Sequence, residues 1–285
     1  MVPDPPPTTS ASQLQTYAMC PRKYALQYLW GVEPEFRSKA LILGSAVHSA
    51  LGWWFTERLA GKTPTIEEAE GILAADLLAG AAGSTVRWKE SSPEATEAEG
   101  KRLVALYLKE HGTLAVKAVE MPFAINLEDP EGTGWVLPRR MKGYFDLVLE
   151  DDSVIEVKTS ARSWQPEALD RHLQAGSYAF AWNVLHGGPS QLDVHVIVKL
   201  KREPRVEVLH VVRGERDTRW WFVAAAAIER AIEERHFPPA PGPLCPECEY
   251  ARACANWTTE LPSFDITRPR LAIVRDERMA DALAL

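Results

Sequence analysis

Apolar side chains recur every three or four positions near the start of the chain, at Leu14, Tyr17, Tyr24 and Tyr28. This spacing is typical of one face of a helix, so we expect a helix over 12–29. Pro21 falls inside it and is expected to break or kink it, because proline lacks the N–H that a helical hydrogen bond needs. The Pro-rich residues before it, 1–9, are expected to be disordered or extended.

Two other patterns divide the rest of the chain. Helical spacing predicts helices over 39–59, 166–185 and 215–235, and two more within 64–110. Alternation of apolar and polar residues predicts strands over 116–127, 141–150, 153–157, 192–200 and 205–212. Helices come first, and strands and helices then alternate. This order predicts an α/β or α+β core with helical additions at the N-terminal side.

Composition narrows the class of protein. The chain has 285 residues, 46% of them hydrophobic, and a net charge of −7. The longest apolar run, 220–228, is far shorter than the roughly 20 residues that span a bilayer. The first residues do not resemble a secretory signal. We therefore expect a cytoplasmic protein with no membrane partner. We expect one domain over 10–257, a helical insertion at 64–110, and a C-terminal tail at 258–285.

Two neighbouring predicted strands carry the most informative residues, Asp146 on the first and Glu156-Val-Lys158 on the second. Residues two apart on a strand share a face, so Glu156 and Lys158 point to one side and Val157 to the other. Asp146 lies opposite Glu156 only if the connecting loop has an odd length, such as 150–152. A two-residue turn would place Val157 opposite Asp146 instead. We therefore predict a three-residue or bulged turn.

This group of residues suits metal-dependent cleavage of a phosphodiester. Two carboxylates bind Mg²⁺ or Mn²⁺, which keep water ligands available for reaction. The metal activates a water and stabilises charge in the transition state, while a nearby lysine orients the water or stabilises that charge. The alternative is an acidic hairpin tip with an exposed Glu–Lys pair, since the motif is short.

Four further residues are candidates for the same site. His48, on the predicted helix 39–59, offers an imidazole ligand that suits Mn²⁺ better than Mg²⁺, or is simply a partly buried histidine. Gln174 and Tyr178 share one helix face; they point to the scissile phosphate or the lysine, or Tyr178 packs in the core. Glu120 is a candidate accessory carboxylate.

The four cysteines form a second candidate site. Cys245, Cys248 and Cys254 have C-x2-C-x5-C spacing, and Cys20 lies far upstream. Four thiolates suit tetrahedral zinc or an iron–sulfur cluster. The one-plus-three arrangement favours the cluster, while disulfides or unconnected thiols are the remaining alternative. A shared metal centre would tie the N-terminal helix to the C-terminal segment.

Taken in order, these motifs resemble the RecB-like branch of the PD-(D/E)XK nucleases, and specifically its iron–sulfur members. That group includes CRISPR-associated spacer-acquisition nucleases and the nuclease domains of bacterial helicase–nuclease repair complexes. The resemblance spans residues 10–257. It is carried by Ser12-Gln-Leu-Gln-Thr-Tyr17 through Cys20-Pro-Arg-Lys-Tyr24, Leu43-Gly-Ser-Ala-Val-His48, Gly143-x-x-Asp146, Glu156-Val-Lys158, Gln174-x3-Tyr178 and Cys245-x2-Cys248-x5-Cys254.

The resemblance implies a restriction-endonuclease-like core, in which helices flank a central mixed sheet, and a metal-dependent DNA exonuclease that acts on single-stranded ends. Its partners would be helicase or spacer-acquisition proteins, in DNA repair, recombination or CRISPR spacer acquisition. Lys158 would be the catalytic lysine, and Gln174 and Tyr178 the motif that follows the core. The metal ligands would be His48, Asp146, Glu156 and the Val157 carbonyl; the ligands of a [4Fe–4S] cluster would be Cys20, Cys245, Cys248 and Cys254.

DNA binding requires cations for the phosphates, and two basic clusters, 139–142 and 199–202, are the candidates. Trp53, Trp54 and Trp164 are candidates for stacking on bases, although tryptophan also serves as a core residue. Two rival hypotheses remain. The first is a non-catalytic DNA-binding or assembly module with the same fold. The second is a nuclease that holds zinc in place of the cluster.

Overall fold

The computed structural model describes residues 2–188, 191–200 and 203–256. The C-terminal tail expected at 258–285 lies outside the described residues. Contacts group the described chain up to Cys254 into one unit. Within these residues, no helix is both long enough and apolar enough to cross a membrane.

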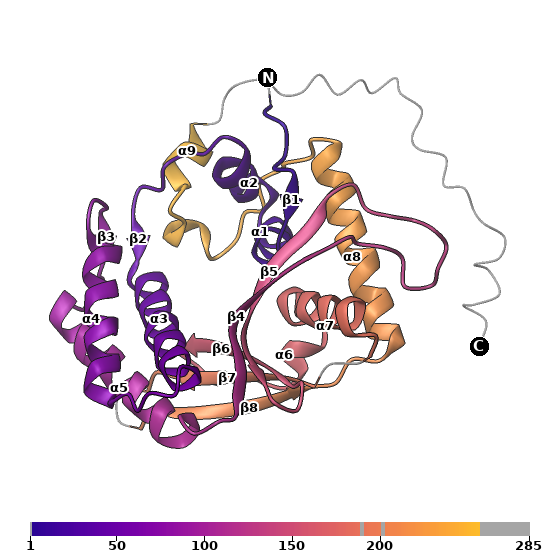
Figure 1. The fold of residues 1–285 in the computed structure, drawn as a ribbon. Coiled ribbons are helices and arrows are strands. Elements are labelled where there is room, and N and C mark those ends of the chain that lie inside the picture. Colours follow the sequence, from indigo (N-terminus) through magenta and orange to yellow (C-terminus); the bar gives the residue numbers. More distant parts are fainter. Residues whose placement is uncertain (1, 189–190, 201–202, 257–285) are drawn as a thin grey trace, which may run out of the picture. The chain divides into compact units, whose positions relative to one another are not determined.

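A mixed sheet runs through the centre of the described chain (Figure 1). Its strands follow the order β1-β5-β6-β7-β8, and β4 also pairs with β5. The β1–β5 and β6–β7 pairs are parallel and the others antiparallel. The strands are β1 (Thr8–Thr9), β4 (Val116–Ile125), β5 (Arg140–Leu149), β6 (Val154–Ser160), β7 (Leu192–Val198) and β8 (Arg205–Val211). The expected α/β class with a central mixed sheet is confirmed.

Helices cover both faces of this sheet, as Figure 1 shows. One face is covered by α3 (Lys39–Leu59), α4 (Ile66–Ala81) and α5 (Pro93–His111), and the other by α1 (Ala11–Met19), α7 (Leu173–His186) and α8 (Glu215–Glu233). The shorter elements are α2 (Pro21–Tyr24), a π-helix (Ala25–Leu29), α6 (Glu167–Asp170), a 3-10 helix (Cys245–Glu247), α9 (Ala251–Ala255) and the strand pair β2 (Arg37–Ser38) and β3 (Val86–Arg87).

Each face of the sheet has its own hydrophobic core. On β7, Val194, Val196 and Val198 pack into the core under α7 and α8, whereas Ile197 packs into the core under α3, α4 and α5. A strand buried on both faces reads as a nearly continuous apolar run. Helices α4 and α5 help to close the second core with their apolar faces.

The structure differs from the sequence-based expectation at two points. Within the segment expected to be disordered or extended, Thr8 and Thr9 form β1 and pair with Arg140 and Met141 of β5. Thr9 is fully buried, so the Pro-rich start provides a short edge strand. The helix expected over 166–185 is divided into two helices. Helix α6 ends at Asp170, and α7 begins at Leu173, where the side chain of His172 caps the new N-terminus by accepting the Ala175 N–H.

Candidate active site

The β5–β6 hairpin has the three-residue loop that the sequence predicts. Leu147 pairs with Ile155 and Val148 with Val154, and continuing these pairs places Asp146 opposite Glu156. The loop closes with Asp152 in the left-handed region, at φ 69°, a conformation that aspartate tolerates better than most residues. The predicted register is therefore confirmed.

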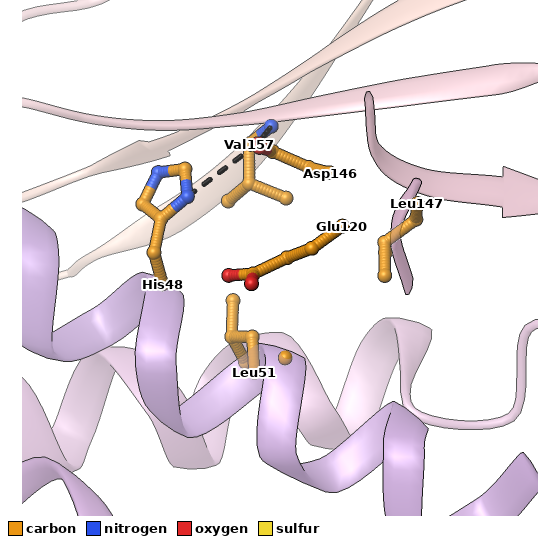
Figure 2. A pocket seen from close by; sticks show the side chains of 7 residues that line it. His48, Leu51, Glu120, Asp146, Leu147 and Val157 are labelled. Carbon is orange, nitrogen blue, oxygen red and sulfur yellow. Dashed lines mark hydrogen bonds and ion pairs between the residues drawn. The ribbon is translucent and has the colours of Figure 1, made fainter. Parts of the chain in front are cut away.

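Asp146 connects the sheet to helix α3. Its Oδ2 accepts the backbone N–H of Val157 at 2.9 Å and lies 3.4 Å from Nδ1 of His48. Figure 2 shows His48 reaching from α3 toward Asp146. A small cavity of about 20 Å³ lies among His48, Glu120, Asp146 and Val157, large enough for about one water-sized occupant.

Glu156 precedes Val157, which lines that cavity, and is buried with 3% of its surface exposed. Its Oε1 accepts a hydrogen bond from Nε2 of Gln174 at 2.8 Å and forms an ion pair with Nζ of Lys158. Its Oε2 is buried and has no hydrogen-bond partner among the described residues. Burial, and then the nearby Asp146, raise the pKa of Glu156 to about 8, while Lys158 opposes the shift. The resting site thus holds a buried carboxyl group with one unsatisfied oxygen, and burial favours its neutral form.

Gln174 and Tyr178 lie on the face of α7 turned toward Glu156. Gln174 Nε2 also donates to the Tyr178 hydroxyl at 3.1 Å. The Tyr178 ring packs edge-on against Phe145 and Phe123, and its pKa is raised by burial and then by Glu156 and Asp146. Tyr178 therefore serves the core with its ring and the carboxylate group with its protonated hydroxyl.

Glu120 reaches the same cavity from β4. The pairs Val119–Leu147 and Met121–Phe145 flank it, so Glu120 stands opposite Asp146. Its φ of 45° lies in the left-handed region, which is costly for a residue with a long side chain. In Figure 2 its carboxylate extends toward α3. The sequence gives no signal for this left-handed backbone conformation. Only the carboxylate side chain of Glu120 makes it a candidate from sequence.

The donor set fits a divalent cation. It offers the His48 imidazole and the carboxylates of Glu120 and Asp146 around a cavity of the right size, and an unsatisfied buried oxygen on the neighbouring strand at Glu156. Among the described residues, no three His, Cys, Asp or Glu side chains stand ready in a metal-binding arrangement. Lys158 holds one oxygen of Glu156, so the carboxylates would have to turn toward a bound ion.

The four cysteines are free thiols drawn from the two ends of the described chain. Burial raises the pKa of Cys254, Arg22 opposes the shift, and Cys20 and Cys245 add to it. Cys20 likewise adds to the raised pKa of Cys248. The thiol of Cys245 also accepts the Gly242 N–H at 3.3 Å.

Contacts between the chain ends support that grouping. Lys23 forms an ion pair with Glu249 at 2.9 Å, and the Glu35 N–H donates to the Glu249 carbonyl at 2.9 Å. Arg22 Nε donates to the Phe237 carbonyl at 2.9 Å. In Figure 1, α9 lies beside α2. The four free thiols therefore lie on segments that contact each other, but among the described residues no three of them are arranged to hold a metal ion as they stand.

Two of the expected DNA contacts are wrong. Arg139 is buried and forms two hydrogen bonds to Glu229 of α8, at 2.6 and 2.9 Å, so it is unavailable to phosphate. Trp54 is a core residue whose indole N–H donates to the Gly112 carbonyl at 3.1 Å. Arg140 and Lys142 are exposed, and 201–202 lie outside the described residues.

The described chain combines a mixed sheet, covered by helices on both faces, with an Asp, Glu and Lys group on two adjacent strands. A family model described as "PD-(D/E)XK nuclease superfamily" matches residues 8–255. The chain belongs to this superfamily. Its members generally use divalent metals such as Mg²⁺, which agrees with the donor set.

One solved structure supports the fold. A protein from Eubacterium rectale described as "Putative exonuclease" superposes with a TM-score of 0.56 at 13% identity, covering 93% of this chain and 94% of that chain. A second structure, SSO0001, gives a TM-score of 0.37 at 11% identity, covering 85% of this chain and 94% of that chain. A search of curated proteins gives no match.

Proposed function

We propose that the chain is a Mg²⁺- or Mn²⁺-dependent deoxyribonuclease that removes nucleotides from single-stranded DNA ends. The convergence of Asp146, Glu156 and Lys158 on the β5–β6 hairpin carries this proposal, together with membership of the superfamily. The exonuclease part is supported by the description of the Eubacterium rectale protein, whose fold this chain shares.

Each residue of the site has a distinct part in the proposed reaction. His48, Asp146, Glu156 and the Val157 carbonyl hold the divalent ion, and Glu120 is an accessory carboxylate. When bound, the ion supplies an activated water and neutralises charge on the phosphodiester. Lys158 Nζ lies beside Glu156, where it orients the attacking water or stabilises the developing charge.

Gln174 is a positioning residue in this proposal. Its amide holds Oε1 of Glu156 and the Tyr178 hydroxyl at the same time. A carboxylate fixed on one oxygen presents the other in a defined direction, which favours ion binding.

Cleavage of end-labelled DNA tests the function. Parent protein with Mn²⁺ is expected to shorten single-stranded DNA progressively from an end and to cut duplex more slowly. Lys158→Ala should lose at least about 10²-fold in rate, the usual cost of one stabilising donor. Lys117→Ala removes an exposed lysine of β4, paired with Asp152, and should behave as the parent.

The same assay separates the rival functions. Internal fragments from the first time points would replace the exonuclease with an endonuclease. A parent that binds DNA and never cuts it would instead support a non-catalytic binding or assembly module. A Lys158→Ala rate equal to that of the parent would remove the proposed site.

We further propose that Cys20, Cys245, Cys248 and Cys254 hold a [4Fe–4S] cluster, and that the chain belongs to the RecB-like iron–sulfur branch. The order of the motifs and the coupling among the four free thiols support this. Helicase or spacer-acquisition proteins are partners by that resemblance alone. Anaerobic purification should give a brown protein with four irons per chain; a colourless protein with one zinc ion would exclude the cluster.

A further inference from the structure

A second, larger cleft opens beside the cavity that holds the carboxylates. Its volume is about 370 Å³. It is lined by Ser49, Gly52, Trp53 and Thr56 of α3 and by Val119 and Glu120 of β4. Gly52 and Glu120 also line the small cavity at Asp146. The cleft therefore begins where the proposed active site ends.

The α3 residues of the cleft recur at the spacing of one helix face. The face combines two hydroxyl side chains with an aromatic ring. Trp53 is half-buried and contacts the edge of the second core, whereas the adjacent Trp54 is buried and bound to Gly112. Of two consecutive tryptophans, one completes the core and the other lines an open cleft.

Gly52 keeps this passage open. A Cβ placed there would stand 3.7 Å from Oε1 of Glu120 and 3.8 Å from Cγ1 of Val119. These are ordinary contact distances, so any longer side chain would fill the space between α3 and β4. Glu120, with its left-handed backbone, stands at the boundary between the two cavities.

The charges of the lining residues indicate what the cleft binds. They include one carboxylate, Glu120, and no cation, so a phosphate group would be repelled there. An uncharged, flat group with polar edges suits an aromatic ring and two hydroxyls. The volume lies near the lower end of the range for small-molecule sites, about 300–1,000 Å³, which suits a group of the size of one nucleoside.

We propose that this cleft binds the unpaired base of the nucleotide next to the scissile phosphate, with Trp53 as the stacking residue. The proposal rests on the proposed DNA nuclease function and adds to it the reason for single-strand preference. A duplex cannot place one base in the cleft without unpairing it. Stacking accepts every base. The subsite should therefore select single-stranded over duplex DNA without selecting a particular base sequence.

The test combines a protein change with a DNA change. Trp53→Ala should raise KM for a short single-stranded DNA by about 5- to 150-fold, the range expected for loss of one base stack. Trp53→Phe keeps an aromatic ring and should retain most of the affinity. Trp135→Ala removes an exposed tryptophan on the 126–139 segment and serves as the control. Mn²⁺ affinity should be unchanged in all three.

An abasic nucleotide next to the cleaved bond should weaken binding to the parent by a similar factor. The same lesion should have little further effect on Trp53→Ala, because the contact is already absent. Independent, multiplicative effects would overturn the subsite while leaving the nuclease intact, as would unchanged KM in Trp53→Ala. A parent that neither binds nor cuts single-stranded DNA would overturn both proposals at once.

Discussion

The carboxylate site and the cysteine site are built in opposite ways. Asp146, Glu156 and Lys158 stand on adjacent long strands, whose register is fixed by backbone pairing on both sides. The cysteines stand on a helix end, a short 3-10 turn and a five-residue helix, joined by a few side-chain contacts such as Lys23–Glu249.

This difference teaches which site depends on its ligand for its shape. The sheet positions the carboxylates through its own hydrogen bonds, so removal of the divalent ion should leave the fold unchanged. The segment that carries three of the cysteines, 245–255, has no buried residue in its 3-10 helix or in α9. Helices this short have little stability of their own. A centre bound by all four thiols would supply most of what holds that segment in place.

Asp146→Asn should have the largest effect and should be confined to chemistry. The amide can still accept the Val157 N–H, so the hairpin should fold normally. The lost charge weakens ion binding and should lower the cleavage rate by about 10³-fold, equivalent to several kcal/mol. Calorimetric titration with Mn²⁺ should show the weakened affinity without any activity measurement.

Asp193→Asn is the matched control for this change. Asp193 lies at the start of β7 and contacts His210 at 2.7 Å, outside the proposed site. Its variant should bind Mn²⁺ and cleave as the parent does. An Asp146→Asn rate within tenfold of the parent would contradict the assignment of Asp146 as a ligand.

The buried ion pair of Arg139 and Glu229 lies between the carboxylate site and the cysteine site. Its loss should give the next largest effect, on the stability of the fold. Arg139 precedes β5 and binds Glu229 of α8, while its Nη1 lies 3.3 Å from Oε1 of Gln13 and 3.2 Å from the Tyr24 hydroxyl. Arg139→Met leaves the fully buried Glu229 uncompensated. Urea unfolding should show a loss of about 3–5 kcal/mol, whereas Arg140→Met, at the exposed neighbour, should change little.

The double variant Arg139→Met/Glu229→Leu sharpens this prediction. Replacement of both charges by apolar side chains should restore most of the lost stability, because no charge is left buried alone. If the double variant is less stable than Arg139→Met, the pair contributes net stability and the desolvation argument is wrong.

Cys248→Ser tests the other side of the comparison. Loss of one thiol from a shared centre should cost roughly 2–5 kcal/mol, similar to the loss of a native cross-link. This corresponds to a decrease in Tm of about 5–15 °C for a chain of this size. EDTA treatment of the parent should shift Tm much less. Equal Tm values for Cys248→Ser and the parent would show that the cysteines hold no stabilising centre.

Sequence patterns were sufficient where one local signal decides the structure. Helix α3 runs over Lys39–Leu59, the range that its density of apolar and small residues predicts. The three-residue loop at 150–152 follows from the side-chain period of two, since only an odd loop places two carboxylates opposite each other. The break in the first helix follows from Pro21, after Cys20 ends α1.

Tertiary contacts decided the remaining features. Arg139 looks like a surface cation in a basic cluster, because its partner Glu229 lies 90 residues further along the chain. The strand at Thr8–Thr9 depends on an open edge of β5, which no local pattern reveals. The left-handed Glu120 likewise depends on where β4 meets Asp146. The assigned roles of the site residues remain predictions.

The smallest expected effect is a pH dependence of stability that arises from His195, in the core next to the carboxylate site. His195 of β7 is buried, and its Nδ1 lies 3.0 Å from the Tyr107 hydroxyl. Burial, then His111 and His210, lowers the pKa of His195 to about 3. Below pH 6.5, His195 is protonated in the unfolded chain but stays neutral in the folded chain. The free energy of unfolding should therefore fall as pH falls toward 3.

Between pH 7 and pH 5 this single group should cost the parent about 2 kcal/mol of unfolding free energy. His195→Gln keeps a polar partner for Tyr107 but cannot be protonated. Between pH 7 and pH 5 its unfolding free energy should therefore fall by about 2 kcal/mol less than that of the parent. Urea unfolding of both proteins at the two pH values measures the difference, and His186→Gln, which changes an exposed histidine at the end of α7, should decline as the parent does. Parallel pH profiles for His195→Gln and the parent would mean that His195 is protonated in the fold, and that the core behind the site is wetter than its burial indicates.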